Sequence, residues 1–187
     1  RPSHIQAKRQ YFLGQDIAGM GRDLSTWEIL DGTDKQKIRQ MESITKRHTQ
    51  TPERVNLTDS LEQKYNFKKI GIDDGGIGSG DFGYLLINPS TRRKVISLNN
   101  ASRDIERDGS RRKKLLKEDM YTNLLAMMEH KQIKLLTDED IFHSLRSVQF
   151  ETERGKTRFY GNDTHIAEGL IRAAWLVRTK PLNIYLY

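Results

Sequence analysis

Two short apolar segments that each run into an aspartate and then a glycine-rich turn constrain this chain more than any other feature. The first segment ends at Asp16 and continues as Ile17-Ala18-Gly19-Met20-Gly21, and the second ends at Asp73 and continues through several glycines to Gly80. A carboxylate at the exit of a buried strand is costly unless it is paired or binds a cation. If both segments are parallel strands of one sheet, Asp16 and Asp73 meet in space, as they do in two-metal sites that cleave phosphodiesters.

The rest of the chain alternates between strand-like and helix-like segments, with no internal repeat and no linker. This alternation predicts a single α/β domain over residues 1–187, with a central mixed sheet flanked by helices. The predicted strands are Tyr11–Gln15, Ser25–Leu30, an edge strand at Ile38–Thr45, Lys68–Asp73 (parallel to the first), Lys94–Leu98, a strand or extended segment at Ile133–Leu136, and a β-hairpin made of Val148–Glu151 and Lys156–Tyr160. One predicted helix begins at Thr51. The other predicted helices cover Gly80–Ile87, Lys113–His130, Asp138–Ser147 and Asn162–Val177.

The last predicted helix carries a third acid. Its apolar stripe predicts the face that packs on the sheet, and Asp163 falls near the centre of that stripe. Asp163 is therefore expected to point towards the sheet, either as a third metal carboxylate or as an acid that complements the helix dipole. His165, Glu168 and Arg172 lie on another side of the helix. They form either a solvated face with an i,i+4 Glu168–Arg172 pair or a group that places His165 or Glu168 beside the metals.

Composition narrows the classes of partner. The chain has 32 Lys and Arg against 25 Asp and Glu, a formal net charge of +7, which favours polyanions. It has no cysteine, which excludes disulfides, Cys-ligated zinc and thiol catalysis. No apolar run approaches the roughly 20 residues that span a bilayer, and no signal peptide is visible, so we expect no membrane partner. Because the chain begins Arg1-Pro2 without Met, we expect a fragment of a longer protein.

Three motifs in order resemble the nuclease domain of viral DNA-packaging terminase large subunits. They are the segments 16–23 (DIAGMGRD), 70–80 (IGIDDGGIGSG) and 161–170 (GNDTHIAEGL), and the resemblance covers nearly the whole chain. It implies a ribonuclease-H-like fold and a metal-dependent endonuclease that cuts concatemeric viral DNA with two divalent cations, Mg²⁺ or Mn²⁺. It also implies catalytic and metal-binding roles for Asp16, Asp73 and Asp163, with Asp23, Asp74, His165 and Glu168 as accessory candidates.

The same resemblance implies double-stranded DNA as the substrate and the host cytoplasm as the location. An upstream ATPase motor domain, absent from this chain, the small terminase subunit and the portal are the implied protein partners. The basic segment Ala101–Lys114 is too polar to order itself and is expected to be mobile without DNA. The candidates for DNA phosphate contacts are loop and hairpin residues, namely Arg22, Arg111, Arg112, Lys113, Arg154 and Lys156.

Two other functions remain open at this point. The run Gly78-Ser79-Gly80-Asp81-Phe82-Gly83 matches the dinucleotide fingerprint G-x-G-x-x-G, although nearby acids would repel a pyrophosphate. Alternatively, the chain is a ribonuclease-H-like scaffold that binds DNA without cutting it. A nucleotide-binding P-loop is excluded at Gly155-Lys156-Thr157, because Phe150 stands where the motif requires its first glycine.

Overall fold

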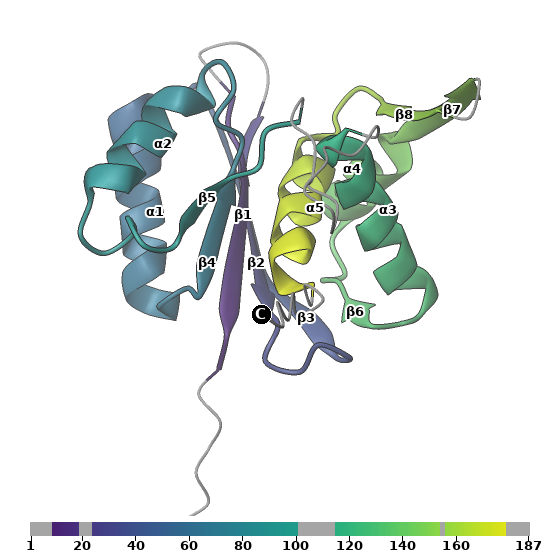
Figure 1. Cartoon of the computed structure of the whole chain (residues 1–187), viewed down its shortest axis with the longest axis horizontal. Helices are drawn as coiled ribbons and strands as arrows, with labels where there is room; N and C mark the ends of the chain where they lie inside the picture. Colours follow the sequence, from purple (N-terminus) through teal and green to yellow (C-terminus); the bar gives the residue numbers. More distant parts are fainter. Residues whose placement is uncertain (1–8, 19–23, 101–114, 154–155, 179–187) are drawn as a thin grey trace, which may run out of the picture.

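A six-stranded mixed sheet separates two layers of helices in the computed structural model, which describes residues 9–18, 24–100, 115–153 and 156–178 (Figure 1). The strand order is β5-β4-β1-β2-β3-β6. The β1–β2 and β2–β3 pairs are antiparallel and the other three pairs are parallel. The strands are β1 (Tyr11–Asp16), β2 (Leu24–Asp31), β3 (Ile38–Arg47), β4 (Lys69–Ile72), β5 (Val95–Ser97) and β6 (Ile133–Lys134).

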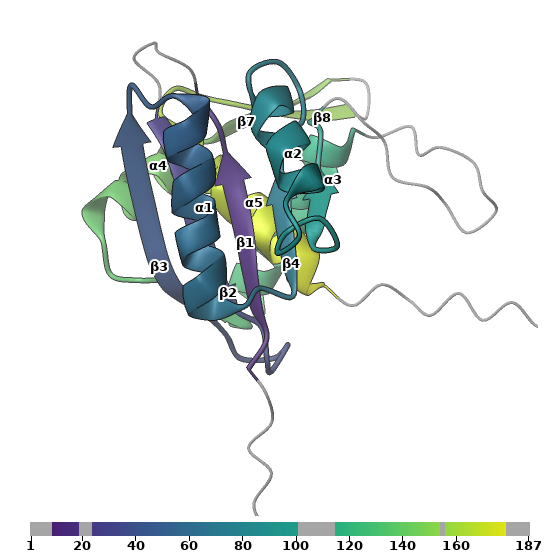
Figure 2. The same cartoon turned by 90° about the vertical axis from the view of Figure 1, so that its left-hand side faces the viewer.

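Five helices cover the two faces of this sheet in the described residues. On one face lie α1 (Thr51–Tyr65) and α2 (Gly78–Ile87), and on the other lie α3 (Leu116–Glu129), α4 (Glu139–Ser147) and α5 (His165–Val177) (Figures 1 and 2). A separate hairpin of β7 (Gln149–Glu153) and β8 (Lys156–Tyr160) precedes α5. No helix among the described residues is long and apolar enough to cross a membrane.

Alternation along the central strands builds two hydrophobic cores, one on each face. In β1, Phe12 packs with the core around α3 and α5, while Leu13 packs with the core around α1 and α2. In β2, Leu30 packs with the core around α3 and α5, and Ile29 packs with the core around α1 and α2. Successive side chains of a strand point to opposite faces, so a strand buried on both faces needs a nearly continuous apolar run.

Helix α5 is the centre of the second layer and lies directly on β1 and β2. A Cβ atom added to Gly14 of β1 would lie 2.1 Å from the Gly169 carbonyl oxygen and 2.4 Å from the Ala173 nitrogen. A Cβ atom added to Gly169 would lie 2.7 Å from the Thr26 hydroxyl. The two glycines therefore allow the helix and the strand to approach closely, and this brings the polar residues of α5 to the end of β1.

The structure confirms the expected mixed sheet, the parallel pairing of the first and fourth strands, and the hairpin before the last helix. It corrects two details. The expected edge strand, β3, pairs with the two-residue β6 and is not the outermost strand. The last helix begins at His165 and not at Asn162, because Asp163 has a left-handed backbone conformation with φ of 56°, which a right-handed helix cannot contain.

Candidate active site

Asp16 and Asp73 lie side by side at one edge of the sheet. Gln15 of β1 is paired with Ile72 of β4 in a parallel register, and each aspartate is the next residue of its chain segment. Their side chains are 17% and 21% exposed, so both carboxylates reach the surface while most of each side chain is covered. The described structure therefore brings these two acids together, as the sequence predicts.

A single guanidinium from α5 bridges the two aspartates. Arg172 Nη1 lies 3.3 Å from Asp16 Oδ1, and Arg172 Nη2 lies 2.9 Å from Asp73 Oδ2. The Arg172 side chain is fully buried. Burial alone would lower the pKa of Arg172, but the negative charges of Asp16, Glu168 and Asp73 raise it above its ordinary value. The guanidinium is therefore a permanent cation within the acid pair.

Glu168 is a buried member of the same network. Its carboxylate is 5% exposed and accepts hydrogen bonds from Tyr121 Oη at 2.8 Å and from Arg172 Nη1 at 3.4 Å. Lys117 Nζ forms an ion pair with it at 2.7 Å. Burial would raise the pKa of Glu168, but Arg172 and Lys117 lower it below its ordinary value. Burial and the Glu168 charge raise the pKa of the Tyr121 hydroxyl, so Tyr121 acts as a hydrogen-bond donor.

His165 connects the acid pair to the start of α5. Its Nδ1 atom lies 3.1 Å from Asp16 Oδ2, and its backbone carbonyl accepts a hydrogen bond from the Thr26 hydroxyl at 3.1 Å. Asp16 therefore contacts Arg172 through one oxygen and His165 through the other. These contacts fix the orientation of the carboxylate at the end of β1.

The expected orientation of Asp163 is wrong. Its side chain is 75% exposed, and its nearest ionic partner is His143, 4.0 Å away. The periodicity argument failed because Asp163 precedes Thr164, the N-cap residue of α5, and so does not share the helical direction of the apolar stripe. Asp163 lines one pocket together with His165, whose ring contacts Asp16.

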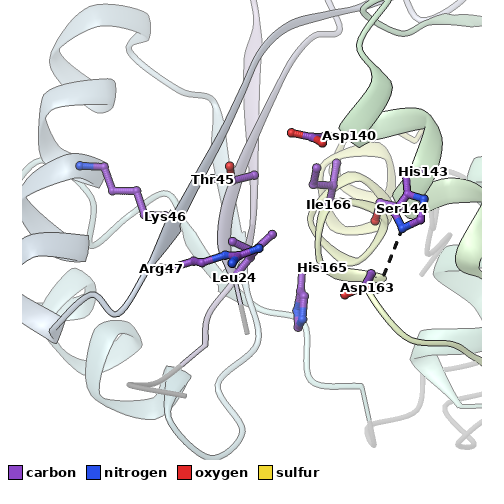
Figure 3. Close-up of a pocket in the computed structure, with 10 residues that line it drawn as sticks. All are labelled: Leu24, Thr45, Lys46, Arg47, Asp140, His143, Ser144, Asp163, His165 and Ile166. Carbon is purple, nitrogen blue, oxygen red and sulfur yellow. Dashed lines mark ion pairs between the residues drawn. The ribbon is translucent and has the colours of Figure 1, made fainter. Parts of the chain in front are cut away.

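This pocket, of about 450 Å³, lies between the end of β3 and the starts of α4 and α5 (Figure 3). Asp140, His143, Asp163 and His165 line one side of it. Arg47 extends from β3 towards the middle of the pocket, whereas the neighbouring Lys46 points away. The pocket therefore places one basic side chain opposite two histidines and two acids.

Some of the other predicted site residues lie within the part of the chain that the structure describes, and some lie outside it. Asp74 is described and accepts a hydrogen bond from Asn99 at 3.1 Å, so it is tied to the loop after β5. Lys156 is described as the first residue of β8, on the hairpin. The candidates outside the described residues are Asp23, Arg22, Arg111, Arg112, Lys113 and Arg154, together with the predicted mobile segment Ala101–Lys114.

Sequence reasoning missed the central role of Arg172. One of its two interpretations placed Arg172 on a solvated face, but the i,i+4 pair with Glu168 is buried. A signal was present: α5 reads HIAEGLIRAAWLV and is apolar nearly all round, which is typical of a helix enclosed by its neighbours. A charged residue in such a helix must find a buried partner. Lys117, Tyr121 and Arg47 were missed as well, because only the tertiary structure brings them near the site.

The donor set fits a hard divalent cation, although the described residues contain no ready-made cluster of three ligands. Two aspartate carboxylates within reach of one cationic group provide oxygen donors of the type that Mg²⁺ and Mn²⁺ prefer. Asp16 and Asp73 would hold the cation. His165 contacts Asp16 and Glu168 shares Arg172 with both aspartates, whereas among the described residues the ionic partner of Asp163 is His143.

Solved structures with the same fold are nuclease domains of phage large terminases. The large terminase nuclease of thermophilic phage G20c, solved with bound magnesium, has a TM-score of 0.71 at 20% identity, over 94% of this chain and 82% of that one. A mutant nuclease domain of the large terminase subunit of bacterial virus Sf6, solved with manganese and beta-thujaplicinol, has a TM-score of 0.71 at 12% identity, over 90% and 89%.

A large terminase from another thermophilic bacteriophage matches with a TM-score of 0.62 at 15% identity, over 92% of this chain and 40% of that one. No model of a known protein family and no curated protein matches the sequence. The chain thus has the ribonuclease-H-like fold of large terminase nuclease domains, and the predicted fold is confirmed.

Proposed function

We propose that this chain is a metal-dependent DNA endonuclease that cuts concatemeric viral DNA during genome packaging. One observation carries the proposal: Asp16 and Asp73 lie together at the ends of two parallel strands, in a fold shared with large terminase nuclease domains. Neighbours solved with magnesium and with manganese support a dependence on divalent cations.

In this proposal Asp16 and Asp73 hold two divalent cations, Mg²⁺ or Mn²⁺, and Asp163 supplies the third carboxylate. When bound, such cations activate the attacking water and stabilise the leaving oxygen of a phosphodiester. His165 orients the Asp16 carboxylate through its 3.1 Å contact. Glu168 is reassigned: because Lys117 and Tyr121 hold it in a buried position, it orients Arg172 and does not face the substrate.

The wider assignments extend from the same fold. The chain is proposed to be a single nuclease domain, with the ATPase motor in another part of the protein, in keeping with its coverage of 40% of the longer bacteriophage large terminase. Double-stranded DNA is the proposed substrate, the small terminase subunit and the portal are the proposed partners, and the host cytoplasm is the proposed location. The net charge of +7 suits a DNA-binding protein.

The test is the nicking of supercoiled plasmid by the purified chain in Mg²⁺ or Mn²⁺. Asp16→Asn and Asp73→Asn should each lower the cleavage rate by roughly a hundredfold or more, because each removes a carboxylate ligand. Asp34→Asn is the matched control, since Asp34 is an exposed acid in the turn after β2, away from the acid pair. Wild-type cleavage by either site variant would refute the assignment.

The same assay tests which side chain supplies the third metal ligand. Asp163→Asn should abolish cutting and leave the melting temperature unchanged, because the side chain is exposed. Full activity of that variant would move the third ligand to His165.

The two alternatives make different predictions in these experiments. An idle scaffold would bind DNA and cut none of it under any metal condition. The dinucleotide interpretation loses its structural basis, because the fingerprint glycines lie within α2 and not in a turn before it. In addition, Asp81 of that run forms a buried ion pair with Arg54 at 2.6 Å.

A further inference from the structure

We propose that Arg172 is a built-in counter-cation of the metal-free site, which a divalent metal must displace from Asp16 and Asp73. This inference rests on the proposed function, because it concerns the same two carboxylates. It assigns Arg172 a role beyond packing: the guanidinium holds the acid pair together before metal binds, and it sets how tightly metal binds.

The first support is that each oxygen of the acid pair already has a protein partner. Asp16 contacts Arg172 through Oδ1 and His165 through Oδ2. Asp73 accepts from Arg172 on Oδ2 and from the Gly75 backbone N–H, at 2.9 Å, on Oδ1. A metal ion that ligates both aspartates therefore meets the guanidinium at two of these four oxygens, and two cations at one site repel each other.

The second support is the balance of charge in the network. Arg172 forms ion pairs with three carboxylates, those of Asp16, Asp73 and Glu168, at 2.9–3.4 Å. Arg172 and Lys117 offset only two of the three negative charges, which leaves the network attractive to a further cation. A divalent ion supplies more positive charge than the guanidinium it replaces.

The third support is that Arg172 is not fully satisfied where it lies. Its buried Nε atom has no hydrogen-bond partner among the described residues. A buried charge with an unpaired donor is costly, so the ion pairs with the carboxylates are what offset the burial of Arg172.

The guanidinium also has partners that it can keep after exchange. Nη1 donates to the Glu168 carbonyl at 2.8 Å, and Nη2 donates to Asn100 Oδ1 at 3.0 Å. Neither bond involves an aspartate, so both can hold the guanidinium on α5 after exchange.

The experiment measures Mn²⁺ binding and thermal unfolding of the EDTA-treated chain, without DNA. Arg172→Met removes the charge and keeps an unbranched side chain. We expect its melting temperature without metal to fall, because three carboxylates lose their shared partner. We expect its Mn²⁺ affinity, measured by titration calorimetry, to rise roughly tenfold or more, because the competing charge is gone. The increase in melting temperature on adding Mn²⁺ should be larger than in the wild type.

Arg172→Lys keeps the experiment decisive if the Met variant does not fold. Lysine retains the charge but lacks the planar fork that spans two carboxylates. Its Mn²⁺ affinity should lie between those of the wild type and the Met variant.

Arg54→Met is the matched control, because Arg54 of α1 is a second buried arginine paired with an aspartate, Asp81 of α2, and both helices lie on the opposite face of the sheet from α5 (Figure 1). It should lower the melting temperature without metal and leave the Mn²⁺ affinity unchanged.

The outcomes separate this inference from the proposed function. If the wild type binds Mn²⁺ through Asp16 and Asp73 and both Arg172 variants bind it equally or more weakly, the inference is wrong and the nuclease proposal stands. If neither the wild type nor the Arg172 variants bind Mn²⁺, both are wrong. If only the Arg172 variants bind it, Arg172 blocks the site and metal does not displace it in the wild type, so both the exchange and the nuclease proposal are wrong.

Discussion

Glu28 is a fully buried acid in β2 that the proposed chemistry does not use. Gln40 donates to Glu28 Oε2 at 2.7 Å, and Ser43 donates to Oε1 at 2.9 Å. Burial raises the pKa of Glu28 well above its ordinary value, despite these two hydrogen bonds. The folded chain therefore binds a proton that the unfolded chain releases at lower pH.

This shift gives a pH-dependent prediction. The stabilising effect of the proton is complete below the ordinary Glu pKa of about 4.3 and is lost as the pH rises through the raised pKa of the folded state. Glu28→Gln keeps both hydrogen bonds, because its amide can donate to Ser43 and accept from Gln40. We expect it to melt several degrees higher than the wild type at about pH 8, with the difference disappearing towards about pH 4.

Thermal unfolding across this pH range, followed by circular dichroism, checks the prediction. Glu151→Gln on the exposed hairpin is the control and should not change the pH profile. A Glu28→Gln variant that is less stable than the wild type at about pH 8 would show that Glu28 is ionised and paired in the folded chain.

At the scale of elements, the contact between α5 and β1 decides whether the site forms at all. A Cβ atom added to Gly14 would lie within 2.9 Å of three atoms of α5, and two of these are backbone atoms that cannot rotate away. The acid of β1 and the arginine of α5 meet only because this contact is so close. Glycine ordinarily weakens the interior of a strand, but at position 14 it is required for the site to form.

Gly14→Ala should destabilise the chain by roughly 3 kcal/mol or more, because the helix must move away from the strand. The Mn²⁺ affinity should fall as well, since Asp16 and Asp73 lose their alignment with α5. Gly83→Ala is the control: Gly83 lies in exposed α2 with no atom within 4 Å of an added Cβ, and alanine should stabilise that helix by about 0.5–1 kcal/mol. Denaturant unfolding of both variants measures the difference, and equal effects would contradict the packing argument.

At the scale of the whole molecule, the proposed function predicts that DNA meets the end of the sheet where the pocket lined by His165 lies. Arg47 ends β3 at that pocket, whereas Arg39 lies near the other end of the same strand. The two residues are both exposed arginines on one strand, so they differ mainly in position.

Arg47→Ala should weaken the binding of double-stranded DNA in EDTA and reduce the slope of log affinity against log salt by up to about 0.9, as expected for one lost phosphate contact. Arg39→Ala should change neither quantity. Titrations by fluorescence anisotropy at several salt concentrations check this, and equal effects of the two substitutions would place the DNA elsewhere on the surface.

The sequence by itself determined the order of the elements and which two acids meet at one end of the sheet. The strand that ends at Asp16 and the strand that Asp73 follows were predictable, because apolar runs and glycine turns are local signals. Their meeting was predictable too, because parallel neighbouring strands exit at the same edge of a sheet. The stripe of α5 was correct from Ile166 to Val177, where the helical period holds.

Only the tertiary structure decided the positions of the residues that complete the site. Asp163 was misplaced because a left-handed residue interrupts the helical period, and periodicity carries no information beyond the point where the helix begins. The sequence pattern placed Arg172 either on a solvated face or in a group beside the metals, because it related Arg172 only to its neighbours on α5. The burial of Arg172 depends on Asp16, Asp73 and Glu168. The pairing of one guanidinium with carboxylates as many as 156 residues away is a long-range electrostatic contact, and local sequence patterns do not encode it.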